Sequence, residues 1–358
     1  MACAADREYA IGLAVTIRSA LENLDPARRL RLYLIDGGLS RGVRRQLLRA
    51  WDPDRVEVAW IEPDLRRIRE LPIDDYVSHS TYLRLLLPEV LPASLERVIY
   101  LDSDLVVLGD LGALWERPFD QQAVLAAQDV GYPFIDAELA LPNYAECAPY
   151  LWGARPIPNY VALGLDPKAK YFNGGVMLVD LAAWRREGLC PRMLECLRAN
   201  REHAVAWDQY ALNAVLAGRW GELDLRWNVP LSLFRYPSGR QSPFGETAWR
   251  QAIEAPFVVH FVGFAKPWYW GARGVYHPWQ QLFERHLEGT GWPRWRRLRW
   301  TLLPVLRQRL GKGAGRAAKR LRAGARRLRR AARRLRGRAA GTRRALRRGS
   351  SRGGGRPA

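Results

Sequence analysis

Two aspartates, Asp102 and Asp104, stand one residue apart in the apolar run "RVIYLDSDLVVLGDL", residues 97–111. In an extended chain residues i and i+2 point the same way, with Cα atoms roughly 6.5 Å apart. Both carboxylates can therefore converge on one cation at the carboxyl end of a strand, where open α/β sheets bind ligands. Two carboxylates this close need a proton or a metal ion to offset their repulsion. The simpler alternative is a pair of solvated aspartates that cap the next turn.

Further polar groups stand within apolar stretches. Asn173 lies in "YFNGGVML", Asp208 and Gln209 lie in "WDQYAL", and His260 lies in "VVHFVGFAKPW". Burying a polar group is costly unless the group is hydrogen-bonded or coordinated. Together with the two aspartates, these positions indicate a polar site inside the fold. A hydrogen-bonded core histidine remains the alternative for His260 taken alone.

The elements that would position these residues alternate along the first 110 residues. Apolar residues recur at helical spacing from Leu13 to Leu24, and Ser40 is a candidate N-cap for the next helix. Short apolar runs that end at turn residues predict buried strands. We expect helices over 13–24, 41–51 and 80–91, and strands over 30–36, 56–61 and 97–102. This alternation predicts an α/β fold with a mostly parallel sheet flanked by helices.

Residues 130–170 differ from this alternating pattern. They are rich in Pro, Tyr and Gly and show neither helical nor strand periodicity. A connection of this length inside a compact domain is usually functional. We therefore predict an excursion that serves the site.

Charge divides the chain into two parts. The 358 residues carry a formal net charge of +21, yet residues 294–358 hold 25 Arg or Lys and no acidic residue. Residues 1–293 are therefore mildly acidic. We predict one catalytic domain over 1–293 and a basic tail, helical or disordered, over 294–358.

The sequence also argues against several classes of protein. The four cysteines are scattered without a CxxC pair, which predicts free thiols and neither a zinc site nor a disulfide framework. Charged residues interrupt the first 20 positions, so no signal peptide is expected. No run of about 18 uncharged apolar residues is present, and we predict a cytoplasmic protein without a transmembrane helix.

The basic tail has one narrow apolar stripe. Leu and Ala recur there with 4,3 spacing from Leu321 to Ala339 on an otherwise Arg-covered segment. Trp292, Trp295 and Trp300 suit the headgroup layer of a membrane. We predict that the tail lies on anionic lipid at the inner face of the cytoplasmic membrane. The alternatives are a nucleic-acid-binding arm, which we do not expect, and a solvated disordered tail.

Four segments in order, "YLDSDLVV", "YFNGGVMLVDL", "WDQYALN" and "HFVGFAKPW", resemble glycosyltransferase family 8. The likeness runs over residues 4–268 and is greatest to bacterial lipopolysaccharide and lipooligosaccharide galactosyl- and glucosyltransferases. It implies a GT-A fold, in which a Rossmann-like domain binds a UDP-sugar and a divalent cation, usually Mn²⁺ and otherwise Mg²⁺. It also implies transfer with retention of anomeric configuration.

The resemblance assigns metal and diphosphate ligands. Asp102 and Asp104 match the family's DxD motif, and His260 matches its third protein ligand. Carboxylate oxygens with one imidazole suit Mn²⁺ better than Ca²⁺. Lys266 and the backbone of Gly263 match the family's grip on the diphosphate, although a solvated surface charge is the alternative for Lys266.

The resemblance also assigns a nucleotide-binding loop, "AADREYA". Ala4, Asp6 and Tyr9 fit it, with Tyr9 stacking on uracil and Asp6 accepting from the uracil N–H. Glu8 and Arg7 depart from the family pattern. The family has an apolar strand before this loop, and only "MAC" precedes it here. Either the true start lies upstream or the first strand is truncated, and we favour an upstream start.

The remaining assignments concern the donor sugar. Arg84 matches an arginine that contacts the donor, with an exposed helix charge as the alternative. Ser103 is small enough to admit a ligand, and Asn173 matches a residue that contacts the donor sugar. Asp129 matches a position at the sugar or acceptor site.

Asp208 and Gln209 match a pair under the sugar ring. An amide is a poor nucleophile beside a carboxylate, so we favour attack from the leaving-group face. The expected function is transfer of galactose or glucose from UDP to a glycan or lipid-linked acceptor, in cell-surface polysaccharide synthesis. The alternatives are a non-catalytic nucleotide-sugar-binding or glycan-scaffolding protein, and a nucleic-acid-binding protein suggested by the basic tail alone.

Overall fold

The computed structural model describes residues 1–73, 78–263, 266–268 and 279–292, all within one compact unit, Met1–Arg297. The strands are β1 (Ala2–Ala5), β2 (Leu30–Asp36), β3 (Val56–Ile61), β4 (Arg97–Leu101), β5 (Leu105–Val107), β6 (Val124–Gln128), β7 (Phe172–Asp180), β8 (Trp220–Glu222), β9 (Val229–Pro230) and β10 (Val258–His260). The helices are α1 (Ala10–Glu22), α2 (Arg41–Arg49), α3 (Leu87–Val90), α4 (Leu111–Trp115), α5 (Ala137–Ala140), α6 (Tyr144–Cys147), α7 (Leu181–Arg186), α8 (Leu189–Ala199), α9 (Asp208–Val215), α10 (Gly245–Glu254) and α11 (Trp279–Glu288). The basic tail lies outside the described residues, so its separation from the domain stays a prediction.

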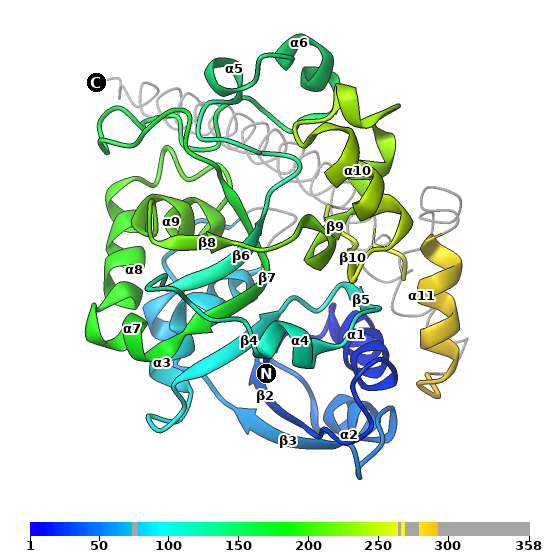
Figure 1. Ribbon diagram of the computed structural model, residues 1–358. Helices are drawn as coiled ribbons and strands as arrows, with labels where there is room; N and C mark the ends of the chain where they lie inside the picture. The colour runs from blue at the N-terminus through cyan, green and yellow to red at the C-terminus, as the bar shows by residue number, and fades with distance from the viewer. Residues whose placement is uncertain (74–77, 264–265, 269–278, 293–358) are drawn as a thin grey trace, which may run out of the picture. The chain divides into compact units, whose positions relative to one another are not determined.

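A seven-stranded sheet of order β3-β2-β1-β4-β7-β6-β8 is the centre of the fold (Figure 1). Strands β3, β2, β1 and β4 run parallel, whereas β7 runs antiparallel to both of its neighbours. Helices flank the sheet. This arrangement confirms the predicted α/β class with a mostly parallel sheet.

The central strand β1 is only four residues long. Ala2 pairs with Tyr33 of β2 on one side and with Tyr100 of β4 on the other, and all of β1 is buried. The strand at the position of the family's first apolar strand is thus formed here by Ala2–Ala5. It includes Ala4, which the family resemblance assigns to the nucleotide-binding loop.

The turn that carries the two aspartates is supported by α1. The Thr16 hydroxyl donates to the carbonyl of Leu105 and accepts from the N–H of Leu105, both at 3.0 Å. The Ser19 hydroxyl accepts from the N–H of Val107 at 3.0 Å. Because β5 is an edge strand, these buried hydroxyls replace a strand partner and fix the end of the turn.

A smaller sheet of order β5-β10-β9 brings a distant segment to that turn. β10 runs antiparallel to β5 with His260 opposite Leu105. The N–H of Phe261 donates to the carbonyl of Asp104 at 2.9 Å. The register of two short strands therefore places His260 beside the aspartates.

The predicted helix over 80–91 is confirmed as helical, but it is not one continuous α-helix. The segment forms a 3₁₀ helix over His79–Leu86 and then α3, with Pro88 in the first turn of α3. Proline has no N–H, so a continuous α-helix would lose a hydrogen bond there, whereas the first turn of a helix tolerates proline. None of the described helices combines the length and apolar character that crossing a bilayer requires.

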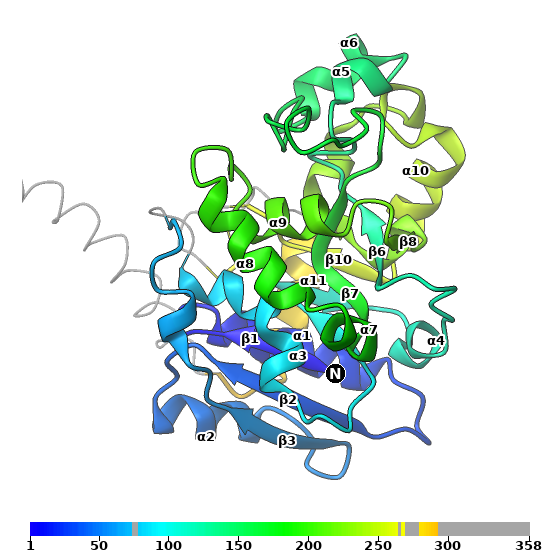
Figure 2. The same cartoon turned by 90° about the vertical axis from the view of Figure 1, so that its left-hand side faces the viewer.

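The predicted excursion is a loop-rich segment that carries the short helices α5 and α6. It packs against residues 225–252 through a second hydrophobic core, which includes Val130, Cys147, Val229 and Leu233. Figure 2 shows α5 and α6 beside α10, away from β2 and β3. The excursion and the 225–252 segment thus support one another, and Ile135 and Ile157 of the excursion also belong to the main core.

Candidate active site

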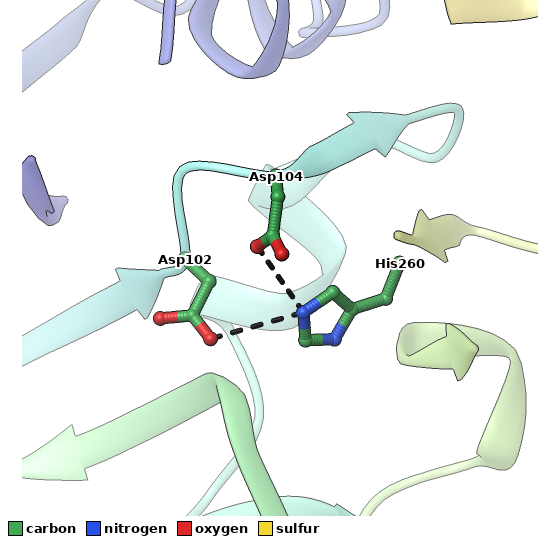
Figure 3. A group of neighbouring side chains, drawn as sticks. All are labelled: Asp102, Asp104 and His260. Atoms are coloured by element: carbon green, nitrogen blue, oxygen red, sulfur yellow. Dashed lines mark ion pairs between the residues drawn. The ribbon is translucent and has the colours of Figure 1, made fainter. Parts of the chain in front are cut away.

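Asp102, Asp104 and His260 converge where β4, β5 and β10 meet (Figure 3). The Nε2 of His260 lies 3.2 Å from Oδ1 of Asp104 and 3.8 Å from Oδ2 of Asp102. One ligand atom of each residue lies within 4.8 Å of the others. Two carboxylates and an imidazole at this spacing fit a divalent cation of the manganese or magnesium type. The expected convergence of the two aspartates is therefore present in the fold.

Buried cations partly balance the two acidic groups. The Nζ of Lys266 donates to Oδ2 of Asp104 and to the carbonyl of Phe261. Burial alone would raise the pKa of Asp104, but Lys266 and His260 outweigh it and hold that pKa well below the ordinary aspartate range. Lys266 is only 5% exposed, so the alternative of a solvated surface charge is wrong.

Arg84 joins two parts of the site. Its Nη2 lies 2.8 Å from Oδ1 of Asp102, its Nε lies 3.0 Å from Oδ2 of Asp208, and its Nη1 donates to the carbonyl of Gly174 at 2.8 Å. Burial would lower the pKa of Arg84, but the two aspartates outweigh it and raise that pKa. At 8% exposure Arg84 is not the exposed helix charge that we kept as an alternative.

Asp208 and Gln209 begin α9, after a residue with unfavourable backbone geometry. Trp207 has φ 48° and ψ −120°, which is strained for a residue with a β-carbon. Burial raises the pKa of Asp208, while Arg84 opposes this rise. The Thr81 hydroxyl donates to Oδ1 of Asp208 at 2.9 Å.

Gln209 is held by two hydrogen bonds. Its Oε1 accepts from the N–H of Gly174 at 3.1 Å, and its Nε2 donates to Oδ2 of Asp129 at 3.0 Å. The same Asp129 oxygen accepts from Nδ2 of Asn173 at 2.7 Å. The amide of Gln209 therefore faces the cavity in one defined orientation.

Asp129 lies behind the site rather than on its surface. It is 1% exposed, and it is not among the described residues that line the cavity. Its other oxygen accepts from the N–H groups of Gly131 and Tyr132, and burial raises its pKa. In this geometry Asp129 orients Asn173 and Gln209, and contact with a sugar stays a prediction.

The nucleotide-loop residues Ala4, Asp6 and Tyr9 line the same cavity. Asp6 Oδ1 accepts from the N–H groups of Glu8 and Tyr9, and Asp6 Oδ2 accepts from the Ser78 hydroxyl at 2.6 Å. The Ser103 hydroxyl donates to the carbonyl of Ala4 at 2.6 Å. The loop and the turn between β4 and β5 are therefore directly linked.

A pair of aromatic rings adjoins the nucleotide loop. The Tyr9 ring packs edge-on against Trp268, with ring centroids 5.7 Å apart, and lies 5.5 Å from the Nζ of Lys266. Gly263 has a φ of 100°, a conformation that favours glycine. These contacts bring Lys266 and Trp268, at the C-terminal end of the "HFVGFAKPW" segment, to the nucleotide loop.

The segments described above surround one cavity of about 960 Å³. The predicted residues that line it are Ala4, Asp6, Tyr9, Arg84, Asp102, Ser103, Asp104, Asn173, Asp208, Gln209, His260, Gly263 and Lys266. The cavity is also lined by residues that we did not predict, among them the apolar and aromatic Tyr132, Trp152, Val205, Leu231 and Phe234, and the polar Ser232 and Arg235. A tryptophan in the 130–170 excursion is the sequence signal that points to these residues, and only the fold shows that 45% of Trp152 is exposed.

Comparison with known proteins assigns the family. A model of glycosyl transferase family 8 matches residues 1–270. The General stress protein A of Bacillus subtilis (strain 168) is 26% identical over 80% of this chain and 92% of its own length. The lipopolysaccharide 1,2-glucosyltransferase of Escherichia coli (strain K12) is 23% identical over 80% of this chain and 77% of its own length.

A solved structure supports the same fold. The galactosyltransferase LgtC, in complex with donor and acceptor sugar analogs, has a TM-score of 0.66 at 23% identity, over 82% of this chain and 98% of that chain. At this identity the likeness is evidence for a GT-A fold alone. Because the family model covers most of the sequence, this chain belongs to glycosyl transferase family 8 and is a glycosyltransferase.

Proposed function

We propose that this glycosyltransferase moves a hexose, galactose or glucose, from a UDP-sugar to a glycan or lipid-linked acceptor with the help of Mn²⁺ or Mg²⁺. The observation that carries the proposal is the convergence of Asp102, Asp104 and His260 on one point of the cavity wall. The family membership and the relatives named for lipopolysaccharide transfer support the substrate class.

The residues around this point suit a departing diphosphate. Asp102, Asp104 and His260 would hold the cation, which as a Lewis acid would stabilise negative charge on the phosphate oxygens. Lys266, whose ammonium is buried beside Asp104, adds a fixed positive charge at the same place. With this charge in place the leaving group needs no separate general acid.

The other side of the site suits the sugar. Asp208 is an acceptor for sugar hydroxyls at a position fixed by Arg84 and Thr81. Gln209 presents its amide from the N-terminal end of α9, held through Asp129 and Gly174. Two hydrogen bonds already constrain this amide, which favours front-face attack over its use as a nucleophile.

The acceptor would occupy the part of the cavity that Trp152 and Tyr132 line. Trp152 is 45% exposed there and packs edge-on against Tyr132, with ring centroids 5.7 Å apart. An exposed indole offers a large apolar surface to the face of a pyranose ring. The acceptor sugar would stack on this surface.

UDP release tests the proposal. We expect Mn²⁺-dependent UDP release from UDP-galactose or UDP-glucose, reduced about 10²–10³-fold in Asp102→Asn and Asp104→Asn. The exposed control Asp54→Asn should keep wild-type activity. Binding of UDP-sugar without release would instead favour the non-catalytic, nucleotide-sugar-binding alternative.

We further propose that the basic tail attaches the enzyme to the inner face of the cytoplasmic membrane, where lipid-linked acceptors lie. The charge of residues 294–358 and their apolar stripe support this proposal. The full chain should co-sediment with anionic vesicles, and a chain ending at residue 293 should not. Equal binding by both chains, or equal binding to neutral vesicles, would contradict the membrane role.

A further inference from the structure

A chain of side-chain hydrogen bonds approaches His260 from behind. The Nδ1 of His260 lies 2.9 Å from Oδ1 of Asn228, and Nδ2 of Asn228 donates to Oδ1 of Asn173 at 2.8 Å. Asn228 is 1% exposed, and it follows the 3₁₀ helix Leu225–Trp227 directly. No motif in the sequence marks Asn228.

A backbone group sets the direction of this chain. The N–H of Gly175 donates to Oδ1 of Asn173 at 2.9 Å, and a backbone N–H can only donate. Oδ1 of Asn173 is therefore an acceptor, and Nδ2 of Asn173 donates to the carboxylate of Asp129. The amide of Asn228 must then direct its Nδ2 to Asn173 and its Oδ1 to His260.

This direction determines which imidazole nitrogen carries the proton. Because Oδ1 of Asn228 only accepts, Nδ1 of His260 must carry a hydrogen. The neutral ring then has its lone pair on Nε2, the atom that faces Asp102 and Asp104. A lone pair beside two carboxylates is the arrangement that a bound cation stabilises, and a hydrogen bond to the other nitrogen strengthens such a ligand.

We propose that Asn228 is a positioning residue that fixes the tautomer and orientation of His260 for binding of the divalent cation. The inference rests on the proposed metal role of Asp102, Asp104 and His260. Asn228 acts through His260 and is not among the described residues that line the cavity. Removing its acceptor should weaken Mn²⁺ binding about 10–100-fold, the usual effect of losing the hydrogen-bond partner of a metal-binding histidine.

Mn²⁺ titration of the metal-free full chain tests this, with free Mn²⁺ followed by its EPR signal. Asn228→Leu should raise the Kd about 10–100-fold. Asn228→Asp should stay much closer to wild type, because its carboxylate still accepts from Nδ1. The control Asn159→Leu, which loses hydrogen bonds to Asn200 and Tyr210 instead, should bind as wild type does.

The outcomes separate the two proposals. Failure of the wild-type chain to bind Mn²⁺ would reject the proposed metal site, and this inference with it. Normal wild-type binding with no change in Asn228→Leu would reject the positioning role alone. Equal weakening in Asn228→Leu and Asn228→Asp would also reject it, because the side chain would then act only by packing.

A spectroscopic test needs no change at Asn228. Long-range ¹H–¹⁵N spectra distinguish the two neutral imidazole tautomers, and His260→Gln identifies the His260 signals. In the metal-free chain at alkaline pH, the His260 ring should carry its proton on Nδ1. A proton on Nε2 would overturn the proposal even if every Asn228 variant failed to fold.

Discussion

The imidazole of His260 lies against the backbone of Gly175. A β-carbon on Gly175 would fall 2.3 Å from Cε1 and 2.8 Å from Nδ1 of that ring, closer than real β-carbons approach. Gly175 is thus the surface on which His260 rests as well as the donor that orients Asn173. The second glycine of "YFNGGVML" is therefore needed because a side chain there would collide with the His260 ring.

We expect Gly175→Ala to displace His260 and to weaken Mn²⁺ binding at least about 10-fold, the lower range for a disturbed metal-binding histidine. Mn²⁺ titration of the metal-free protein measures this. Gly42→Ala is the control, since the nearest atom to its β-carbon would be 3.9 Å away. Unchanged affinity in Gly175→Ala would show that the ring does not lie on this backbone.

Lys266→Met should destabilise the metal-free protein at neutral pH by about 3–5 kcal/mol, because it leaves the buried Asp104 carboxylate without its ammonium partner. Urea unfolding at pH 7.5 measures the change. Added Mn²⁺ should restore more stability to this variant than to wild type, since the dication replaces the lost charge. The exposed Lys168→Met is the control.

The loss of stability in Lys266→Met should depend on pH. The pKa of Asp104 is lowered in the folded protein, so its ion pair contributes stability above the ordinary aspartate pKa of about 4. That contribution is lost as the pH falls through the lowered value. The deficit of Lys266→Met should therefore be largest at neutral pH and shrink below about pH 4. A deficit independent of pH would mean that charge is not its cause.

The elements that local patterns define could be predicted well. The strand over 30–36 matches β2, and Ser40 caps α2 by accepting from the N–H of Val43. The order of the four motifs also predicted a common site, because strand ends on one edge of a sheet gather there. In each case the signal lies within a few consecutive residues.

The parts that depend on distant contacts could not be predicted. The pairing of β10 with β5 sets the position of His260, and nothing in three residues of β10 specifies that partner. Asn228 stands in "RWNVP" without periodicity, so only its bonds in the fold reveal it. The family resemblance assigns Asp129 to the sugar or acceptor site, which stays a prediction, and only the fold reveals the four hydrogen bonds that its carboxylate accepts within the protein.

The reactivity of each thiol should reflect how deeply its cysteine is buried. Burial raises the pKa of Cys3 to about 12 and those of Cys147 and Cys190 to about 11. At pH 8 we expect these thiols to react with Ellman's reagent at least about 100-fold more slowly than in the unfolded chain. Half-buried Cys196 should react first. Rapid reaction of Cys3 would contradict the central position of β1.

Trp152 offers a test of the proposed acceptor site. A β-carbon on Gly131 would fall 2.6 Å from Cδ2 of Trp152, so the indole packs directly against the backbone of Gly131. Trp152 is nevertheless 45% exposed. We expect Trp152→Ala to raise the KM for a methyl hexoside acceptor about 10-fold, equivalent to about 1.4 kcal/mol of lost stacking. Hydrolysis of the UDP-sugar without acceptor should change less than about twofold, because the residues assigned to the donor are left unchanged.

The comparison with Trp152→Phe and Leu139→Ala decides the cause. Phenylalanine keeps a flat apolar face and should recover part of the acceptor affinity, whereas an aliphatic residue would not. Leu139 is 53% exposed in the same excursion and is not among the described residues that line the cavity, so its loss should leave the acceptor KM unchanged. If Trp152→Ala slowed transfer and hydrolysis equally, the indole would support the fold of the excursion, and the acceptor would bind elsewhere.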